Sequence, residues 1–88
     1  MLGRLQNRVA VVTGASAGLG RCMALRFAKE GAKVVCADLQ PGKDGDFTHG
    51  VITNGGGASV FAETNVSEEG SIEDLIAQTV NKFGRVDM

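Results

Sequence analysis

Continuous apolar runs alternate along the chain with stretches whose apolar residues recur at helical spacing. Two of the runs, RVAVVT at Arg8–Thr13 and KVVCAD at Lys33–Asp38, predict strands that are buried on both faces. Between these runs Leu19, Met23 and Phe27 repeat every four residues and predict an amphipathic helix. The first half of the chain is therefore expected to form a strand, a helix and a second strand.

The second half continues the same alternation. Phe47–Asn54 predicts a short helix, and the alternating ASVFAE at Ala58–Glu63 predicts a third strand. Ser71, with a carboxylate three residues later, is expected to cap a last helix that Gly84 ends. The apolar stripe of that helix comprises Ile72, Leu75, Ile76, Thr79, Val80 and Phe83. Residues 85–88 are interpreted as the start of a fourth strand.

This order of elements predicts an α/β fold. Strands that alternate with helices are typical of a parallel sheet with helices on its faces. With 88 residues, the chain has room for one small domain. We expect a partial Rossmann-type, doubly wound parallel sheet of about three strands plus the start of a fourth, with two main helices.

Three glycines lie between the first strand and the first helix, in VVTGASAGLGRC. Gly14 permits a tight turn, Gly18 lets a diphosphate approach the backbone, and Gly20 lets the helix lie close to the sheet. The unpaired N–H groups at a helix N-terminus favour a phosphate. Because no G-K-[ST] follows, a Walker-type loop is excluded. The alternative is a glycine-rich turn that binds nothing.

Asp38 ends the second strand, eighteen residues after Gly20 (38 − 20). That spacing suits a carboxylate that binds the ribose hydroxyls of a dinucleotide. The carboxylate would repel the 2′-phosphate of NADP, and Ala17 and Leu39 leave no neighbouring base to bind it. We therefore expect NAD to be preferred over NADP. The alternative is a solvated carboxylate at a strand end.

TGASAGLG at Thr13–Gly20 resembles the T-G-x-x-x-G-x-G cofactor motif of the short-chain dehydrogenase/reductase family. The whole first strand–helix–strand unit, TNVS at Thr64–Ser67 and VNKFGRVDM at Val80–Met88 are also similar to that family. The resemblance covers nearly the whole chain and fails only over Gln40–Gly57, where the family more often has a longer helix.

The resemblance implies a cofactor site made of Thr13, Gly14, Ser16, Gly18, Leu19, Gly20, Asp38, Leu39, Asn65 and Val66. Thr13 would stabilise the turn, whose other members would line the diphosphate. Asp38 and Leu39 would contact the adenosine ribose, and Asn65 and Val66 the adenine. Asn65 stands where the family usually has Asp, and its amide can both donate and accept. The alternative for Asn65 is a plain turn residue.

The resemblance places the family's catalytic residues beyond the fourth strand, and this sequence contains no tyrosine. No catalytic residue and no metal ligand is expected here, and His49 is interpreted as a solvated loop residue. Residues 1–88 are thus taken as a single partial dinucleotide-binding domain that lacks the C-terminal catalytic part. The implied function is the NAD-binding N-terminal segment of an oxidoreductase that transfers hydride between nicotinamide and an alcohol or carbonyl.

Two alternatives to this function remain open. One is a stand-alone nucleotide-binding or regulatory module without enzymatic activity. The other is a truncated chain that binds nothing because its sheet is incomplete. In strand order 3-2-1-4 the first strand pairs with a fourth. Because that fourth strand is at best a stub, we expect the chain to be marginally stable and to bind NAD weakly.

Charge and composition exclude some partners. The net charge of −1 gives no electrostatic case for nucleic acid or an anionic membrane surface. No targeting signal or membrane-spanning stretch is seen, so a cytoplasmic location is expected, with an organelle as the alternative. Cys22 and Cys36 are too far apart for a C-x-x-C pair, and Cys36 is expected to be buried. A homo-oligomer is considered only for a full-length parent.

Overall fold

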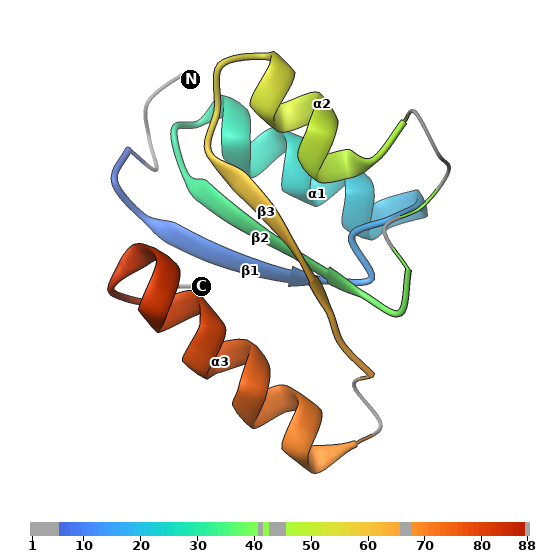
Figure 1. Ribbon diagram of the computed structural model, residues 1–88. Helices are drawn as coiled ribbons and strands as arrows, with labels where there is room; N and C mark the ends of the chain where they lie inside the picture. The colour runs from blue at the N-terminus through green and yellow to red at the C-terminus, as the bar shows by residue number, and fades with distance from the viewer. Residues whose placement is uncertain (1–5, 41, 43–45, 66–67, 88) are drawn as a thin grey trace.

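The computed structural model describes residues 6–40, 42, 46–65 and 68–87. Strands and helices alternate as β1 (Val9–Thr13), α1 (Gly18–Lys29), β2 (Lys33–Asp38), α2 (Thr48–Asn54), β3 (Ser59–Glu63) and α3 (Glu69–Phe83) (Figure 1). The three strands are parallel and lie side by side in the order β1-β2-β3. The predicted α/β architecture is confirmed, and the strand order matches the 3-2-1 half of a doubly wound sheet.

Helices cover both faces of the sheet. α1 and α2 lie on one face and α3 lies on the other (Figure 1). Val34 and Cys36 of β2 point into the first layer, whereas Val35 and Ala37 point into the second. All four side chains are buried. Alternate residues of one strand therefore enter two cores, which is why β2 appears in the sequence as a continuous apolar run.

The buried face of α1 differs from the stripe expected from the sequence. Of the expected stripe, Phe27 packs against the core, whereas Leu19 and Met23 are exposed. The buried centre of the helix is Ala24 instead, whose small side chain lets α1 approach the sheet closely. Gly31 follows the last residues of the helix with a φ of +98°, a left-handed conformation that commonly ends helices.

The last helix begins earlier than expected. α3 starts at Glu69, with Glu68 at its N-cap position and no side-chain cap bond. The predicted cap by Ser71 is therefore wrong. The Ser71 hydroxyl instead accepts a hydrogen bond of 3.2 Å from the backbone N–H of Asn65. Ser71 thus ties the turn after β3 to the first turn of α3. At the other end, Gly84 has a φ of +86° and ends the helix as predicted.

Only part of the predicted α3 stripe contacts the sheet. Leu75 and Thr79 are buried against it, and the Thr79 hydroxyl donates a 2.8 Å bond to the Leu75 carbonyl. Ile72, Ile76 and Val80, one helical turn apart from each other, are exposed. The period of the helix was predicted correctly, but the width of its buried face was overestimated.

The expected fourth strand is not formed among residues 85–87. The chain nevertheless returns to the free edge of β1. The Asp87 N–H donates to the Val9 carbonyl at 2.8 Å, and the Asp87 carboxylate accepts the Val9 N–H at 2.9 Å. The carboxylate also accepts a 2.7 Å bond from the Arg85 guanidinium. Asp87 therefore makes hydrogen bonds with the first residue of β1, at the edge where a fourth strand would pair.

Asp87 is expected to make the stability of the wild-type chain depend on pH, and its replacement by asparagine should remove that dependence. The Val9 N–H and then the Arg85 guanidinium hold the pKa of the Asp87 carboxyl below its ordinary value. A lowered folded pKa stabilises the fold fully above the unfolded value of about 4, and this contribution is lost as pH falls through the folded pKa. Asp87→Asn should therefore lower the urea midpoint at pH 7, and the difference from wild type should shrink in acid.

The matched control is Asp74→Asn, an exposed carboxylate on α3. This variant should change the urea midpoint little at either pH. A gap between Asp87→Asn and wild type that is as large at pH 2.5 as at pH 7 would contradict the assigned role of the charge.

Candidate functional site

The turn between β1 and α1 is built on glycine backbone. Gly14 and Gly18 have φ values of +66° and +58°, which residues with a Cβ rarely adopt. At Gly18 an added Cβ would meet open space, whereas at Gly20 it would lie 2.6 Å from the Gly14 carbonyl carbon and 3.1 Å from the Thr13 oxygen. The start of α1 therefore packs directly on the turn, whereas Gly14 and Gly18 are exposed to solvent.

The N-terminus of α1 is left uncapped. Ala17 occupies the N-cap position, no side chain of the described residues caps the helix, and its first turn carries no acidic residue. The first helical hydrogen bond runs from the Arg21 N–H to the Ala17 carbonyl at 3.3 Å. The N–H groups of the residues between them precede that bond and have no partner within the helix. An anion such as a diphosphate fits this helix end.

Asp38 lies against the glycine turn. One carboxylate oxygen accepts the Ser16 N–H at 3.2 Å, and the other accepts the Leu39 N–H at 2.7 Å. The Ala15 N–H also donates to the Ala37 carbonyl at 3.3 Å, so the turn continues the contact between β1 and β2. The Asp38 carboxylate is thereby placed on the same side of the sheet as the open N-terminus of α1.

The end of β3 joins the same edge of the sheet. The Thr64 N–H donates to the Asp38 carbonyl at 2.8 Å, which brings Asn65 next to the tip of β2. The Asn65 amide donates to a Glu68 carboxylate oxygen at 3.4 Å. Val66, the remaining predicted site residue, lies outside the described residues. The other predicted members gather at this edge, and their role in binding stays a prediction.

Three polar residues near the turn were not identified from the sequence. The Thr48 hydroxyl, which is buried, donates to the Ala15 carbonyl at 2.7 Å. The Arg21 guanidinium donates to Thr48 Oγ1 at 3.3 Å and to the Asp46 carbonyl at 2.7 Å, and it pairs with the Asp46 carboxylate at 3.0 Å. These bonds fasten the segment before α2 to the glycine turn. No sequence motif marks them, because each partner is more than twenty residues away.

His49 is not the solvated loop residue expected from the sequence. It lies on α2 and is half-buried, with its ring 5.5 Å from the Phe47 ring and 5.8 Å from the Phe61 ring. Cys36 is buried as predicted, and burial raises the pKa of its thiol. Cys22 is exposed on α1. These contacts explain His49 and Cys36 as packing residues.

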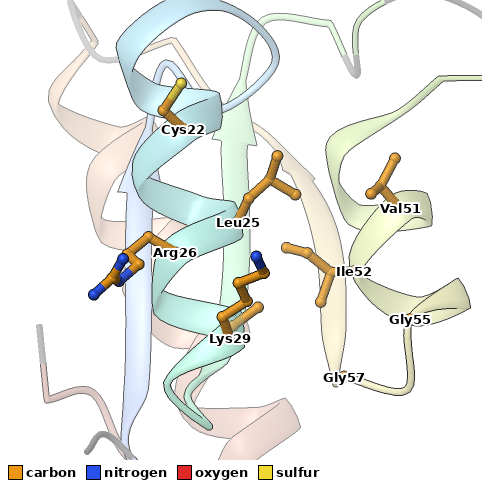
Figure 2. A pocket seen from close by; sticks show the side chains of 9 residues that line it. Cys22, Leu25, Arg26, Lys29, Val51, Ile52, Gly55 and Gly57 are labelled. Carbon is orange, nitrogen blue, oxygen red and sulfur yellow. The ribbon is translucent and has the colours of Figure 1, made fainter. Parts of the chain in front are cut away.

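A separate cavity of about 550 Å³ lies between α1 and α2 (Figure 2). Leu25 and Ile52 face each other across it, Lys29 extends into the gap, and Arg26 points away from α2 (Figure 2). Its lining comprises Cys22, Leu25, Arg26, Ala28, Lys29, Val51, Ile52, Gly55 and Gly57. None of these is a predicted site residue, so this cavity does not belong to the candidate cofactor site.

The parallel sheet, with helices on both faces and a glycine turn at the start of α1, defines an α/β protein of the Rossmann class. Comparison with known proteins narrows this class. The profile described as short chain dehydrogenase matches residues 8–88, and the chain belongs to that family of oxidoreductases. Members of the family use NAD or NADP as cofactor.

Individual relatives agree with this assignment. Tropinone reductase-like 1 of Erythroxylum coca is 39% identical over 85 residues, which are 97% of this chain and 30% of that protein. A putative short-chain dehydrogenase/reductase from Burkholderia xenovorans has a TM-score of 0.87 and 40% identity, over 97% of this chain and 35% of that one. A hydroxysteroid dehydrogenase from Escherichia coli has a TM-score of 0.88 and 31% identity, over 96% and 35%. The chain thus spans about a third of the length of these relatives.

The helices in the described part of the chain are all too short or too polar to cross a bilayer.

Proposed function

We propose that this chain is the cofactor-binding part of an oxidoreductase and that it binds NAD at the C-terminal edge of its sheet. The observation that carries the proposal is the hydrogen bond from the Ser16 N–H to the Asp38 carboxylate, beside the uncapped start of α1. A dinucleotide offers a diphosphate to the helix N-terminus and ribose hydroxyls to the carboxylate. The spacing of these two groups on one edge suits a single ligand that carries both.

The exposed apolar side chains at the edge support the same ligand. Leu19 is 77% exposed beside the turn, and Leu39 is 57% exposed beside Asp38. Apolar side chains next to a polar site are suited to contact the flat rings of a nucleotide. We assign Leu39 and Asn65 to the adenosine end, and Thr13 and the glycine turn to the diphosphate.

Asp38 also supports a preference for NAD over NADP. Both of its oxygens already accept backbone N–H bonds, which keep the carboxylate oriented toward the turn. Hydroxyl groups can donate to the remaining lone pairs, whereas a 2′-phosphate brings a second negative charge to the same place. The carboxylate therefore favours the ribose without the phosphate.

The reaction that we propose for the complete protein is hydride transfer between nicotinamide and an alcohol or carbonyl. The cofactor supplies the hydride chemistry, and this chain supplies binding and orientation. The sequence contains no tyrosine for the family's acid–base step. We therefore propose that residues 1–88 bind the dinucleotide and that other residues of the complete protein carry out the proton transfer.

Two matched glycine variants test the proposal. Gly18 and Gly56 both have positive φ values and open space where a Cβ would be. Alanine at either position should therefore cost a similar amount of stability, about 1 kcal/mol. Only Gly18 faces the proposed diphosphate. Gly18→Ala should weaken NADH binding about tenfold, whereas Gly56→Ala should leave it unchanged. Binding is measured by NADH fluorescence with millimolar ligand.

An amide NMR titration with NAD locates the ligand. Signals from Gly14, Ser16 and Leu39 should shift, and signals from Val51 and Ile52 at the α1–α2 cavity should not. Shifts confined to the cavity, or no saturable shift at millimolar NAD, would contradict the proposed function.

A further inference from the structure

We infer that Asp46 is a second determinant of cofactor choice, which acts by neutralising Arg21 beside the ribose site. This inference rests on the proposed function. Among the cations that the structure describes, Arg21 is the one that contacts the segment between β2 and α2. Its guanidinium is paired with the Asp46 carboxylate at 3.0 Å. The pair therefore neutralises a positive charge beside the segment that follows β2.

The position of Arg21 on α1 explains why its charge matters. The Arg21 N–H donates to the Ala17 carbonyl, so Arg21 lies one helical turn after the N-cap position. Side chains on a helix lean toward its N-terminus, over the preceding turn. While it stays bonded to Thr48 and the Asp46 carbonyl, the Arg21 guanidinium keeps its charge beside the segment that follows β2. A guanidinium there would attract a 2′-phosphate.

A short chain of hydrogen bonds already joins Arg21 to the site. The guanidinium contacts Thr48 Oγ1, Thr48 Oγ1 donates to the Ala15 carbonyl, and the adjoining Ser16 N–H donates to Asp38. The Arg21 side chain is 24% exposed, whereas the Asp46 side chain is 61% exposed. Substitution of Asp46 therefore removes an exposed charge and leaves the guanidinium attached to the fold through the Asp46 carbonyl and Thr48.

The test compares two nucleotides that differ only by a 2′-phosphate, 5′-AMP and adenosine 2′,5′-bisphosphate. Their dissociation constants are measured by amide NMR on the full 88-residue chain. Asp46→Asn should raise the affinity for the bisphosphate relative to 5′-AMP about threefold to tenfold. A general loss of stability would weaken the binding of both nucleotides and leave the ratio of their dissociation constants unchanged.

Three further variants identify the source of the effect. Asp46→Glu retains the negative charge and should keep the wild-type ratio. Adding Arg21→Gln to Asp46→Asn should remove the gain. Adding Lys43→Ala instead should leave the gain intact; Lys43 is a nearby cation in the sequence that lies outside the described residues.

The outcomes separate this inference from the proposed function. An unchanged ratio in Asp46→Asn, with both nucleotides still bound, overturns the inference and leaves NAD binding standing. A gain that persists without Arg21, or that disappears with Lys43, also overturns it. If the wild-type chain binds neither nucleotide at millimolar concentration, the proposed function and the inference both fail.

Discussion

Gly20→Ala is expected to remove a large part of the free energy that stabilises the fold. The new Cβ would lie 2.6 Å from the Gly14 carbonyl carbon and closer still to the Gly14 oxygen. Both atoms belong to the backbone of the turn, so no flexible side chain can move aside. Relief requires α1 to move away from the sheet and lose the packing around Ala24. Overpacking of this kind costs about 3 kcal/mol or more, out of a total of about 5–15 kcal/mol.

The control for Gly20→Ala is Gly70→Ala. Gly70 lies in the first turns of α3, and a Cβ there meets nothing within 4 Å. Alanine is the better helix former, so this variant should gain about 0.5–1 kcal/mol. Both substitutions add one methyl group to a helical glycine and differ only in what the methyl meets. Circular dichroism during urea unfolding measures the difference. A Gly20→Ala midpoint within error of wild type would show that α1 does not pack on the turn.

The strands were predicted more accurately than the helix faces, for a physical reason. In β2, both faces are buried, so four apolar residues in a row leave little choice of structure. In α1, the buried residue Ala24 and Gly20, which packs on the turn, are small, and hydrophobic patterning ranks them below Leu19 and Met23. The buried face of α1 is set by how closely its backbone approaches the sheet. The sizes of the apolar side chains along the helix do not reveal which face that is.

The start of α3 shows a similar limit. Ser71 followed by a carboxylate at the third position has the spacing of a capping box. The helix begins instead at Glu69, and the Ser71 hydroxyl is used by the Asn65 N–H. That bond depends on how the turn leaves β3, which is a tertiary feature. A local motif therefore predicted that a helix was present but misplaced its first residue.

The candidate site shows the same difference between local and long-range features. Gly14, Gly18, Gly20 and Asp38 could be predicted because their spacing fits a strand–turn–helix–strand unit whose geometry is fixed by the sheet. The contacts of Arg21 could not be predicted, because they join α1 to the segment before α2 across a span without a motif. Turn geometry is local and leaves a sequence signature, whereas a long-range polar bond becomes visible only once the elements are placed.

The charge of Asp38 is expected to have the largest effect on cofactor binding. Asp38→Asn removes the charge at a site where the ribose hydroxyls would donate, and hydrogen bonds to a charged group contribute about 1.5–3 kcal/mol. NADH affinity should therefore fall about tenfold to a hundredfold. NADPH affinity should fall less or rise, because the repulsion of the 2′-phosphate is lost as well. The two dissociation constants, measured side by side by fluorescence, give the change in preference.

Glu63→Gln is the matched control for Asp38→Asn, because Glu63 is the register partner of Asp38 on β3 and also ends its strand with a carboxylate. Both variants remove one negative charge from the same edge of the sheet, so a general electrostatic effect would change both by similar amounts. If Asp38 binds the ribose hydroxyls, Glu63→Gln should keep the preference for NADH, whereas Asp38→Asn should lose most of it. Equal losses in the two variants, or a wild-type chain that binds NADPH as tightly as NADH, would show that Asp38 does not select the ribose.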